Sequence, residues 1–160
     1  MFKNKFLTFI SFLFVTFSAS AIGGLSTINY KEPWYSLLNK PTLNPPDWVF
    51  GPVWTTLYLM MTIAIWLFWH SKSRDKNTVY VYLIHLVFNT TWSVVFFVFD
   101  NMVLALFVLI LLVGLIINLI LRFKRVNLVS SYLMIPYLFL CIFALFLNVN
   151  LIIITYYGFS

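Results

Sequence analysis

The chain has 160 residues, of which 62% are hydrophobic and only 9% are charged. So few charges cannot cover a water-facing surface, and the composition therefore excludes a soluble globular protein and predicts a single membrane domain over residues 1–160. The net charge is +6. Because the basic residues lie in short clusters between apolar runs, this charge indicates membrane topology, and no nucleic-acid partner is expected.

Five apolar runs are long enough for transmembrane helices, which need about 20 residues each. We therefore expect an all-α integral membrane protein, a bundle of five transmembrane helices with a structured first loop. The expected spans are residues 6–25, 46–69, 79–99, 102–121 and 129–156, and residues 26–45 form the first loop.

The first span has two interpretations. Two lysines at the N-terminus precede an apolar run that ends in the small residues 18–21, a pattern typical of a cleaved secretory signal peptide. Because residues 22–25 extend the run to membrane length, a retained helix is favoured. In a retained helix, Gly23 and Gly24 would let another helix approach closely.

The first loop is rich in aromatic residues and proline. Trp34, Tyr35 and Leu38 are spaced so that a short helix would lie on the membrane surface with its apolar side down. Asn44, which two prolines follow, predicts the start of the second span. An asparagine side chain there accepts hydrogen bonds from the free amides of the first helical turn.

The second span carries aromatic residues at both ends and on one face. Trp48, Trp66 and Trp69 lie near its ends, where the aromatic belt of a membrane protein is found. Trp54 and Tyr58 lie further inside and one turn apart, so they share one face of the helix. Such a cluster of rings suits either an interfacial anchor or a stacking surface for a flat ligand.

The third span has a polar face. His85, Asn89 and Trp92 follow one another at intervals of four and three residues and therefore lie on one side of the helix. Polar groups are costly in hydrocarbon, so this face should point into the bundle. It either joins helices by hydrogen bonds or lines a cavity in which a few polar groups orient an apolar ligand.

The sequence contains no arrangement of residues for covalent or metal chemistry. Cys141 is the only cysteine and stands among apolar residues, and no second His, Cys or carboxylate lies at metal-ligand spacing from His85. Nothing resembles a nucleophile with its base, a carboxylate pair or a phosphate-binding glycine loop. We therefore expect no catalytic residue, no metal site and no required cofactor.

The basic residues predict the orientation of the chain. If five spans alternate, eight of the ten basic residues fall on one side of the membrane, and only Lys31 and Lys40 fall on the other. Because basic residues are enriched in cytoplasmic connections, the N-terminus is expected inside, and the C-terminus and the first loop outside.

Four segments carry a resemblance to a known family. They are WYSLLNKPTLNPP and WVFGPVWTTLYLMM, which begin at residues 34 and 48, FNTTWSVVFF at residues 88–97, and PYLFLCIFALFLN at residues 136–148. Together they resemble the translocator protein family, also called the tryptophan-rich sensory protein (TspO/MBR) or peripheral-type benzodiazepine receptor family. The resemblance implies a five-helix bundle, usually a homodimer, with a pocket closed by the first loop, residues 26–45, which serves as its lid. The expected location is a bacterial cell membrane, with an organellar membrane as the alternative.

The ligands that this resemblance implies are porphyrins and haem, sterols and benzodiazepine-type compounds. The implied function is the binding, sensing or translocation of tetrapyrroles and similar hydrophobic molecules within the lipid bilayer. The implied ligand-binding residues come from the first loop and from the second, third and fifth spans: Trp34, Tyr35, Pro45, Trp54, Tyr58, His85, Asn89, Trp92, Leu140 and Ala144.

Two alternative functions stay open. Light-dependent porphyrin breakdown in this family involves the tryptophan that matches Trp34 and a second one, but the second position is Leu140 here, which argues against an enzyme. The Tyr and basic residue of the animal members' cholesterol motif do not follow Leu147, so sterol recognition through that motif is not expected. The other alternative is a structural scaffold without a ligand, in which the polar face serves only helix packing.

Overall fold

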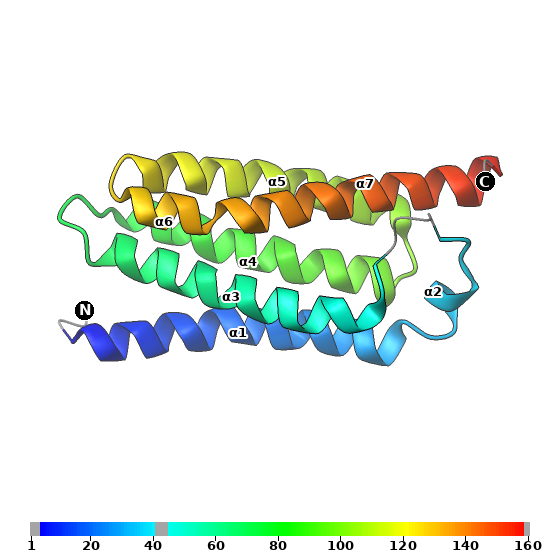
Figure 1. Cartoon of the computed structure of the whole chain (residues 1–160), viewed down its shortest axis with the longest axis horizontal. Coiled ribbons are helices and arrows are strands. Elements are labelled where there is room, and N and C mark those ends of the chain that lie inside the picture. Colours follow the sequence, from blue (N-terminus) through cyan, green and yellow to red (C-terminus); the bar gives the residue numbers. More distant parts are fainter. Residues whose placement is uncertain (1–3, 41–44, 159–160) are drawn as a thin grey trace.

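The computed structural model describes residues 4–40 and 45–158, which form a bundle of long helices (Figure 1). Five stretches are long and apolar enough to cross a membrane, with α6 and α7 together forming the fifth. No strand occurs in the described ranges. The predicted all-α bundle of five transmembrane spans is confirmed. The helices are α1 (Lys5–Tyr30), α2 (Trp34–Leu37), α3 (Asp47–Trp69), α4 (Lys76–Phe97), α5 (Met102–Lys124), α6 (Leu128–Leu133) and α7 (Ile135–Tyr157).

The long helices pack side by side in a ring. Helix α1 contacts α3 and α4, and α5 contacts α4 and α7, while α3 completes the ring mainly through α6. The N-terminus, the α3–α4 connection and α6 lie at one end of the bundle, and α2 and the C-terminus lie at the other (Figure 1). The two basic connections and the N-terminus therefore share one end, as alternating spans require.

The first helix is longer than its apolar run. Helix α1 continues to Tyr30, so the predicted end at Leu25 and the predicted loop start at Ser26 are wrong. The hydroxyl of Ser26 donates to the carbonyl of Ile22 at 2.9 Å, and a second such bond, of 3.0 Å, joins the next residue to the carbonyl four residues before it. Because these hydroxyls bond within their own helix, they do not end it. The lid is therefore shorter than predicted and begins at residue 31.

The other boundaries differ by smaller amounts. Helix α4 begins at Lys76 and ends at Phe97, and α5 extends to Lys124. The start signal predicted at Asn44 lies outside the described residues. The fifth span is divided at Met134 into α6 and α7. Pro136 explains this break, because proline has no amide hydrogen and its ring clashes with the carbonyl four residues earlier.

The half of the bundle near the basic connections is a filled core. The hydroxyls of Thr16 and Tyr82, on α1 and α4, are 2.7 Å apart and satisfy each other within it. The large side chains that are fully buried there include Met61, Ile65, Phe68, Tyr82, Ile116, Leu119, Phe123, Met134 and Tyr137. Because these two buried hydroxyls bond to each other, neither lacks a hydrogen-bond partner.

The outer face of the bundle is apolar. Phe14, Val87, Phe107 and Phe139, each on a different helix, are between 61% and 73% exposed. A chain that presents large apolar side chains on this scale needs lipid around it. The protein is therefore an integral membrane protein.

The three tryptophans predicted for the aromatic belt lie in different surroundings. Trp48 is 76% exposed, as a belt residue should be. Trp66 donates its indole N–H to the carbonyl of Lys5 at 3.0 Å and thereby ties α3 to α1. Trp69 is buried and packs edge-on against Phe12. The belt prediction is thus wrong for Trp69, because a residue near the end of a span can still face the neighbouring helix.

Candidate functional site

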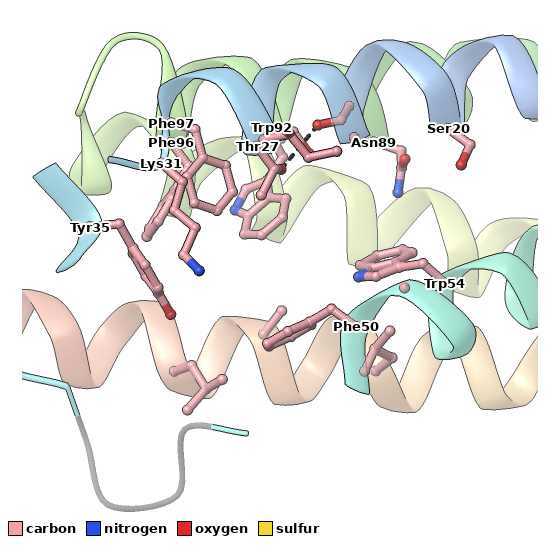
Figure 2. A pocket seen from close by; sticks show the side chains of 18 of the residues that line it. Ser20, Thr27, Lys31, Tyr35, Phe50, Trp54, Asn89, Trp92, Phe96 and Phe97 are labelled. Atoms are coloured by element: carbon pink, nitrogen blue, oxygen red, sulfur yellow. Dashed lines mark hydrogen bonds between the residues drawn. The ribbon is translucent and has the colours of Figure 1, made fainter. Parts of the chain in front are cut away.

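A cavity of about 520 Å³ lies inside the bundle, at the end that carries α2 (Figure 2). Its walls come from α1, α3, α4 and α7, with Tyr35 of α2 at the lid. The lining residues are Ser20, Gly23, Gly24, Thr27, Ile28, Lys31, Tyr35, Phe50, Gly51, Trp54, Thr55, Tyr58, Asn89, Trp92, Ser93, Phe96, Phe97, Leu140, Phe143, Ala144, Leu147, Asn148 and Leu151.

Most of the ten residues predicted from the sequence meet at this cavity, although they come from four separate segments. Residues about one helical turn apart, such as Trp54 and Tyr58 or Asn89 and Trp92, share one face of their helix. In each of these helices that face points into the bundle. The predicted residues that line the cavity are Tyr35, Trp54, Tyr58, Asn89, Trp92, Leu140 and Ala144. Whether they contact a ligand stays a prediction.

Aromatic rings form two sides of the cavity. Figure 2 shows Phe50 and Trp54 of α3 facing Trp92 and Phe96 of α4 across the space. The Trp92 and Phe96 rings are stacked with their centroids 5.6 Å apart, and Trp54 lies 5.7 Å from the ring of Tyr58. Opposed faces of this kind suit a flat apolar molecule, since aromatic faces prefer offset stacking and apolar contact.

A small polar network joins three helices where the cavity meets the filled core. The hydroxyl of Tyr58 on α3 donates to Oδ1 of Asn89 on α4. Nδ2 of Asn89 donates to the hydroxyl of Tyr137 on α7 at 2.8 Å. Asn89 therefore fulfils the interhelical role considered from the sequence, and it also lines the cavity. The two interpretations of this residue are not exclusive.

His85 lies one turn below the lining. It is fully buried, and its Nδ1 hydrogen bonds with the carbonyl of Tyr82. Its ring centroid lies 4.8 Å from that of Tyr82 and 5.9 Å from that of Tyr137. The polar face of α4 thus extends beyond the inner end of the cavity. The cavity ends at Asn89, where Tyr58 and Tyr137 both bond to the side-chain amide. His85 packs in the core and is not among the lining residues.

Trp34 and Pro45 also lie outside the lining. Trp34 packs edge-on against Phe96, with 5.3 Å between ring centroids. Tyr35, its neighbour on α2, is buried against Phe96 and Phe97 and reaches the cavity. Trp34 therefore packs behind the lining residue Phe96, whereas Tyr35 itself lines the cavity.

Lys31 is the one charged side chain among the described lining residues. It follows the last residue of α1, and its Nζ lies 5.6 Å from the centroid of the Tyr35 ring. The sequence prediction missed it because the end of α1 was placed at Leu25. A cation at the lid end of an apolar cavity can hold an anionic group of a ligand close to water.

Two further lining residues lie on the helix faces predicted for α4 and α7, one turn beyond the predicted residues. Phe96 lies one turn beyond Trp92 on α4, and Asn148 lies one turn beyond Ala144 on α7. Extending the predicted set of residues by one helical turn on each face would have included both.

On α1, a Cβ added at Gly23 would lie 3.3 Å from Oγ of Ser93, so the predicted close approach of another helix is confirmed at Gly23. A Cβ added at Gly24 would meet nothing within 4 Å, so the prediction is wrong for Gly24.

No group of three His, Cys, Asp or Glu side chains that could hold a metal ion occurs within residues 4–40 and 45–158. The lining consists mainly of apolar and aromatic side chains, with a few neutral polar ones and Lys31. Such a lining is compatible with an apolar molecule held by shape and stacking.

The family model described as "TspO/MBR family" matches residues 11–154, a range that contains every lining residue of the cavity. The chain belongs to the TspO/MBR family. Among its relatives, a tryptophan-rich protein TspO from Chlorobaculum tepidum is 37% identical over 127 residues, which cover 74% of this chain and 77% of the relative. A tryptophan-rich sensory protein from Cereibacter sphaeroides is 34% identical and covers 79% and 80% of the two chains.

The similarity of this TspO/MBR chain extends to animals. The translocator protein of Homo sapiens is 34% identical over 119 residues, which cover 72% of this chain and 70% of the human protein. The matched range of the family model begins within α1 and ends within α7. The cavity is therefore built entirely from the part of the chain that this family shares.

Proposed function

We propose that this TspO/MBR protein is a membrane translocator or sensor whose cavity binds tetrapyrroles such as porphyrin or haem. The family and the names of its relatives support the translocator or sensor role. The observation that carries the ligand proposal is the pair of aromatic walls, with Trp54 on one side and Trp92 on the other. Sterols and benzodiazepine-type compounds are further ligands of compatible apolar character.

The size and the charge of the cavity support a flat ligand with an acidic edge. Its volume of about 520 Å³ falls within the range of about 300–1,000 Å³ typical of small-molecule sites. A porphyrin ring would stack between Trp54 and Trp92, while its carboxylates would lie toward Lys31 at the lid end. Buried carboxylates need a partner of opposite charge, and Lys31 is positioned to supply it.

Titration of protoporphyrin IX into the purified protein, followed by the Soret absorbance band, tests this proposal. Trp54→Ala removes one aromatic wall, and we expect its dissociation constant to rise about tenfold, since a ring pair contributes about 0.5–1.5 kcal/mol beyond its buried area. Trp48→Ala is the matched control, because Trp48 is exposed on the same helix and outside the lining. Equal affinities of the two variants would rule out the cavity as the porphyrin site.

The scaffold alternative keeps one observation in its favour, the network of Asn89 with Tyr58 and Tyr137. A scaffold predicts that no hydrophobic small molecule raises the melting temperature of the protein. A binding protein predicts that protoporphyrin IX raises it in proportion to the logarithm of ligand concentration. Thermal denaturation with and without porphyrin therefore separates the two functions.

Three further features belong to the proposal: a homodimer, residence in a bacterial cell membrane, and an inside N-terminus. The separation of basic residues between the two ends of the bundle supports the orientation. Mass measurement of the protein in detergent or nanodiscs tests the dimer, and a molecular mass of one chain would contradict it.

A further inference from the structure

Asn148 is a buried polar residue without a hydrogen-bond partner. It lies on α7, is 2% exposed and lines the cavity. Neither the nitrogen nor the oxygen of its side-chain amide forms a hydrogen bond to any described residue. Buried polar groups in native proteins are nearly always bonded, so an amide that lacks both partners requires an explanation.

Two other asparagine side chains nearby do have partners. Asn89 bonds through its oxygen and its nitrogen to two tyrosines. Asn150, two residues beyond Asn148, donates to the carbonyl of Phe146 at 2.8 Å. The lining residues around Asn148 on its own helix are Ala144, Leu147 and Leu151, and their side chains are apolar. Asn148 is therefore the lining amide whose hydrogen-bonding capacity is unused among the described residues.

Trp92 provides a second unpaired group in the same lining. Its indole Nε1 is buried and forms no hydrogen bond within the described ranges. An indole N–H is a donor only, whereas an amide side chain both donates and accepts. Two lining residues, one on α4 and one on α7, thus carry two unpaired nitrogen donors and one unpaired oxygen acceptor within the described ranges.

We propose that Asn148 forms a hydrogen-bonding subsite for a neutral ligand group that carries a donor and an acceptor side by side, such as a carboxamide or a lactam. The side-chain oxygen accepts from the N–H of that group, and the side-chain nitrogen donates to its carbonyl. This subsite rests on the proposed function, because it requires that the cavity take up a ligand. It makes Asn148 a residue that selects among flat ligands by their polar groups.

The apolar surroundings of Asn148 explain why the group is neutral. Its neighbours in the lining on the same helix are Ala144, Leu147 and Leu151. An ionised carboxylate placed there among apolar side chains would lose its hydration without gaining an opposite charge. Lys31 at the lid end is the place for an anionic group, so the two polar positions of the cavity distinguish charged from neutral groups.

A matched pair of probes tests the subsite. Pyrene-1-carboxamide and methyl pyrene-1-carboxylate share one flat ring system, but only the amide has an N–H. Binding is measured by energy transfer from tryptophan to pyrene. We expect the wild-type protein to bind the amide about tenfold more tightly than the ester. We expect Asn148→Leu to reduce this ratio to below about twofold, while the control Asn150→Leu preserves it.

The outcomes separate the subsite from the cavity. If the wild-type protein binds neither probe, the subsite is overturned, and the titration of protoporphyrin IX alone decides the proposed function. If it binds both equally well, or if Asn148→Leu keeps the preference, the subsite is overturned and the cavity stands. Nuclear magnetic resonance of the asparagine side chains gives a test that needs no variant: the Asn148 amide signals must shift when the carboxamide binds. Unshifted signals would also overturn the subsite.

Discussion

Nδ2 of Asn89 on α4 lies 2.8 Å from the hydroxyl oxygen of Tyr137 on α7. This bond joins two helices across the inner end of the cavity, and the hydroxyl of Tyr58 extends it to a third helix. All three side chains are buried. Removing one of them leaves another without its hydrogen-bond partner, so the network can be tested through protein stability as well as through binding.

Asn89→Leu should lower the stability of the bundle by about 2 kcal/mol, because it leaves the hydroxyls of Tyr58 and Tyr137 buried without Asn89 as a partner. Thermal or chaotrope denaturation in detergent measures the loss. A double-mutant cycle with Tyr137→Phe should give a coupling energy of about 0.5–3 kcal/mol. Strictly additive effects would show that the Asn89 and Tyr137 side chains do not interact.

Tyr82→Phe should destabilise the filled half of the bundle. The hydroxyl that it removes lies 2.7 Å from that of Thr16, and a typical hydrogen bond contributes about 1 kcal/mol. Tyr80→Phe is the matched control, because Tyr80 is on the same helix and 60% exposed. We expect a lower melting temperature for the first variant only, and equal melting temperatures would contradict the α1–α4 bond.

Lys31→Met should weaken the binding of protoporphyrin IX but not that of its dimethyl ester. The proposed partners of Lys31 are the porphyrin carboxylates, and hydrogen bonds to charged groups contribute about 1.5–3 kcal/mol, or about tenfold or more in affinity. Titration of both compounds into wild-type and variant protein gives the ratio. The same loss for acid and ester would show that Lys31 acts by shape and not by charge.

Asp75 should make the stability of the protein depend on acidic pH. Its carboxylate accepts from the backbone nitrogen of Thr78 at 2.7 Å and from the Thr78 hydroxyl at 2.8 Å, which caps α4. Partial burial favours a higher pKa, but these bonds and the charge of Arg122 lower the pKa of Asp75 below its usual 3.8. The carboxylate therefore stabilises the folded state above that value, and this contribution is lost as the pH falls through the lowered pKa.

The measurement for Asp75 compares melting temperatures between pH 7 and pH 2. Asp75→Ala should lose about 1 kcal/mol at pH 7, since it removes the helix cap. Asp75→Asn keeps a capping oxygen but cannot titrate, so its melting temperature should fall less steeply than that of the wild type below pH 4. Identical pH profiles of wild type and Asp75→Asn would contradict this assignment.

The orientation of the bundle can be tested by cysteine labelling in a Cys141→Ala background. Asn39 lies in the lid and Ser73 in the α3–α4 connection, and both are exposed. A membrane-impermeant maleimide added to intact cells should label Asn39→Cys and leave Ser73→Cys unlabelled until the cells are opened. The reverse pattern would place the N-terminus outside.

The sequence predicts which side chains point into the bundle better than it predicts how far along each helix the cavity extends. The spacing of Trp54 and Tyr58, and of Asn89 and Trp92, correctly placed these four residues on inward faces, because helical geometry alone decides which residues share a face. The same reasoning placed His85 beside them. Whether a residue on that face reaches the cavity depends on where the opposite helices meet, and the contacts of Asn89 with α3 and α7 are not encoded in the local pattern of α4.

The boundary of α1 was harder to predict for a local reason. Ser26 and Thr27 favour loops when their hydroxyls compete with the backbone, but here each hydroxyl bonds to the carbonyl four residues earlier. The local sequence is compatible with both states, and packing against the rest of the bundle decides between them. Lys31 was missed as a cavity residue because its position depends on this extension of the helix.

The cavity extends through only one half of the bundle. Its lining uses residues 20–31 of α1, 50–58 of α3, 89–97 of α4 and 140–151 of α7, and the described core beyond Asn89 is filled. The hydrogen bonds of Asn89 with Tyr58 and Tyr137 lie between this cavity and the filled half. A continuous path from the cavity to the opposite face of the membrane would require Asn89 to separate from both tyrosines, so the bonds that stabilise the bundle also separate its two halves.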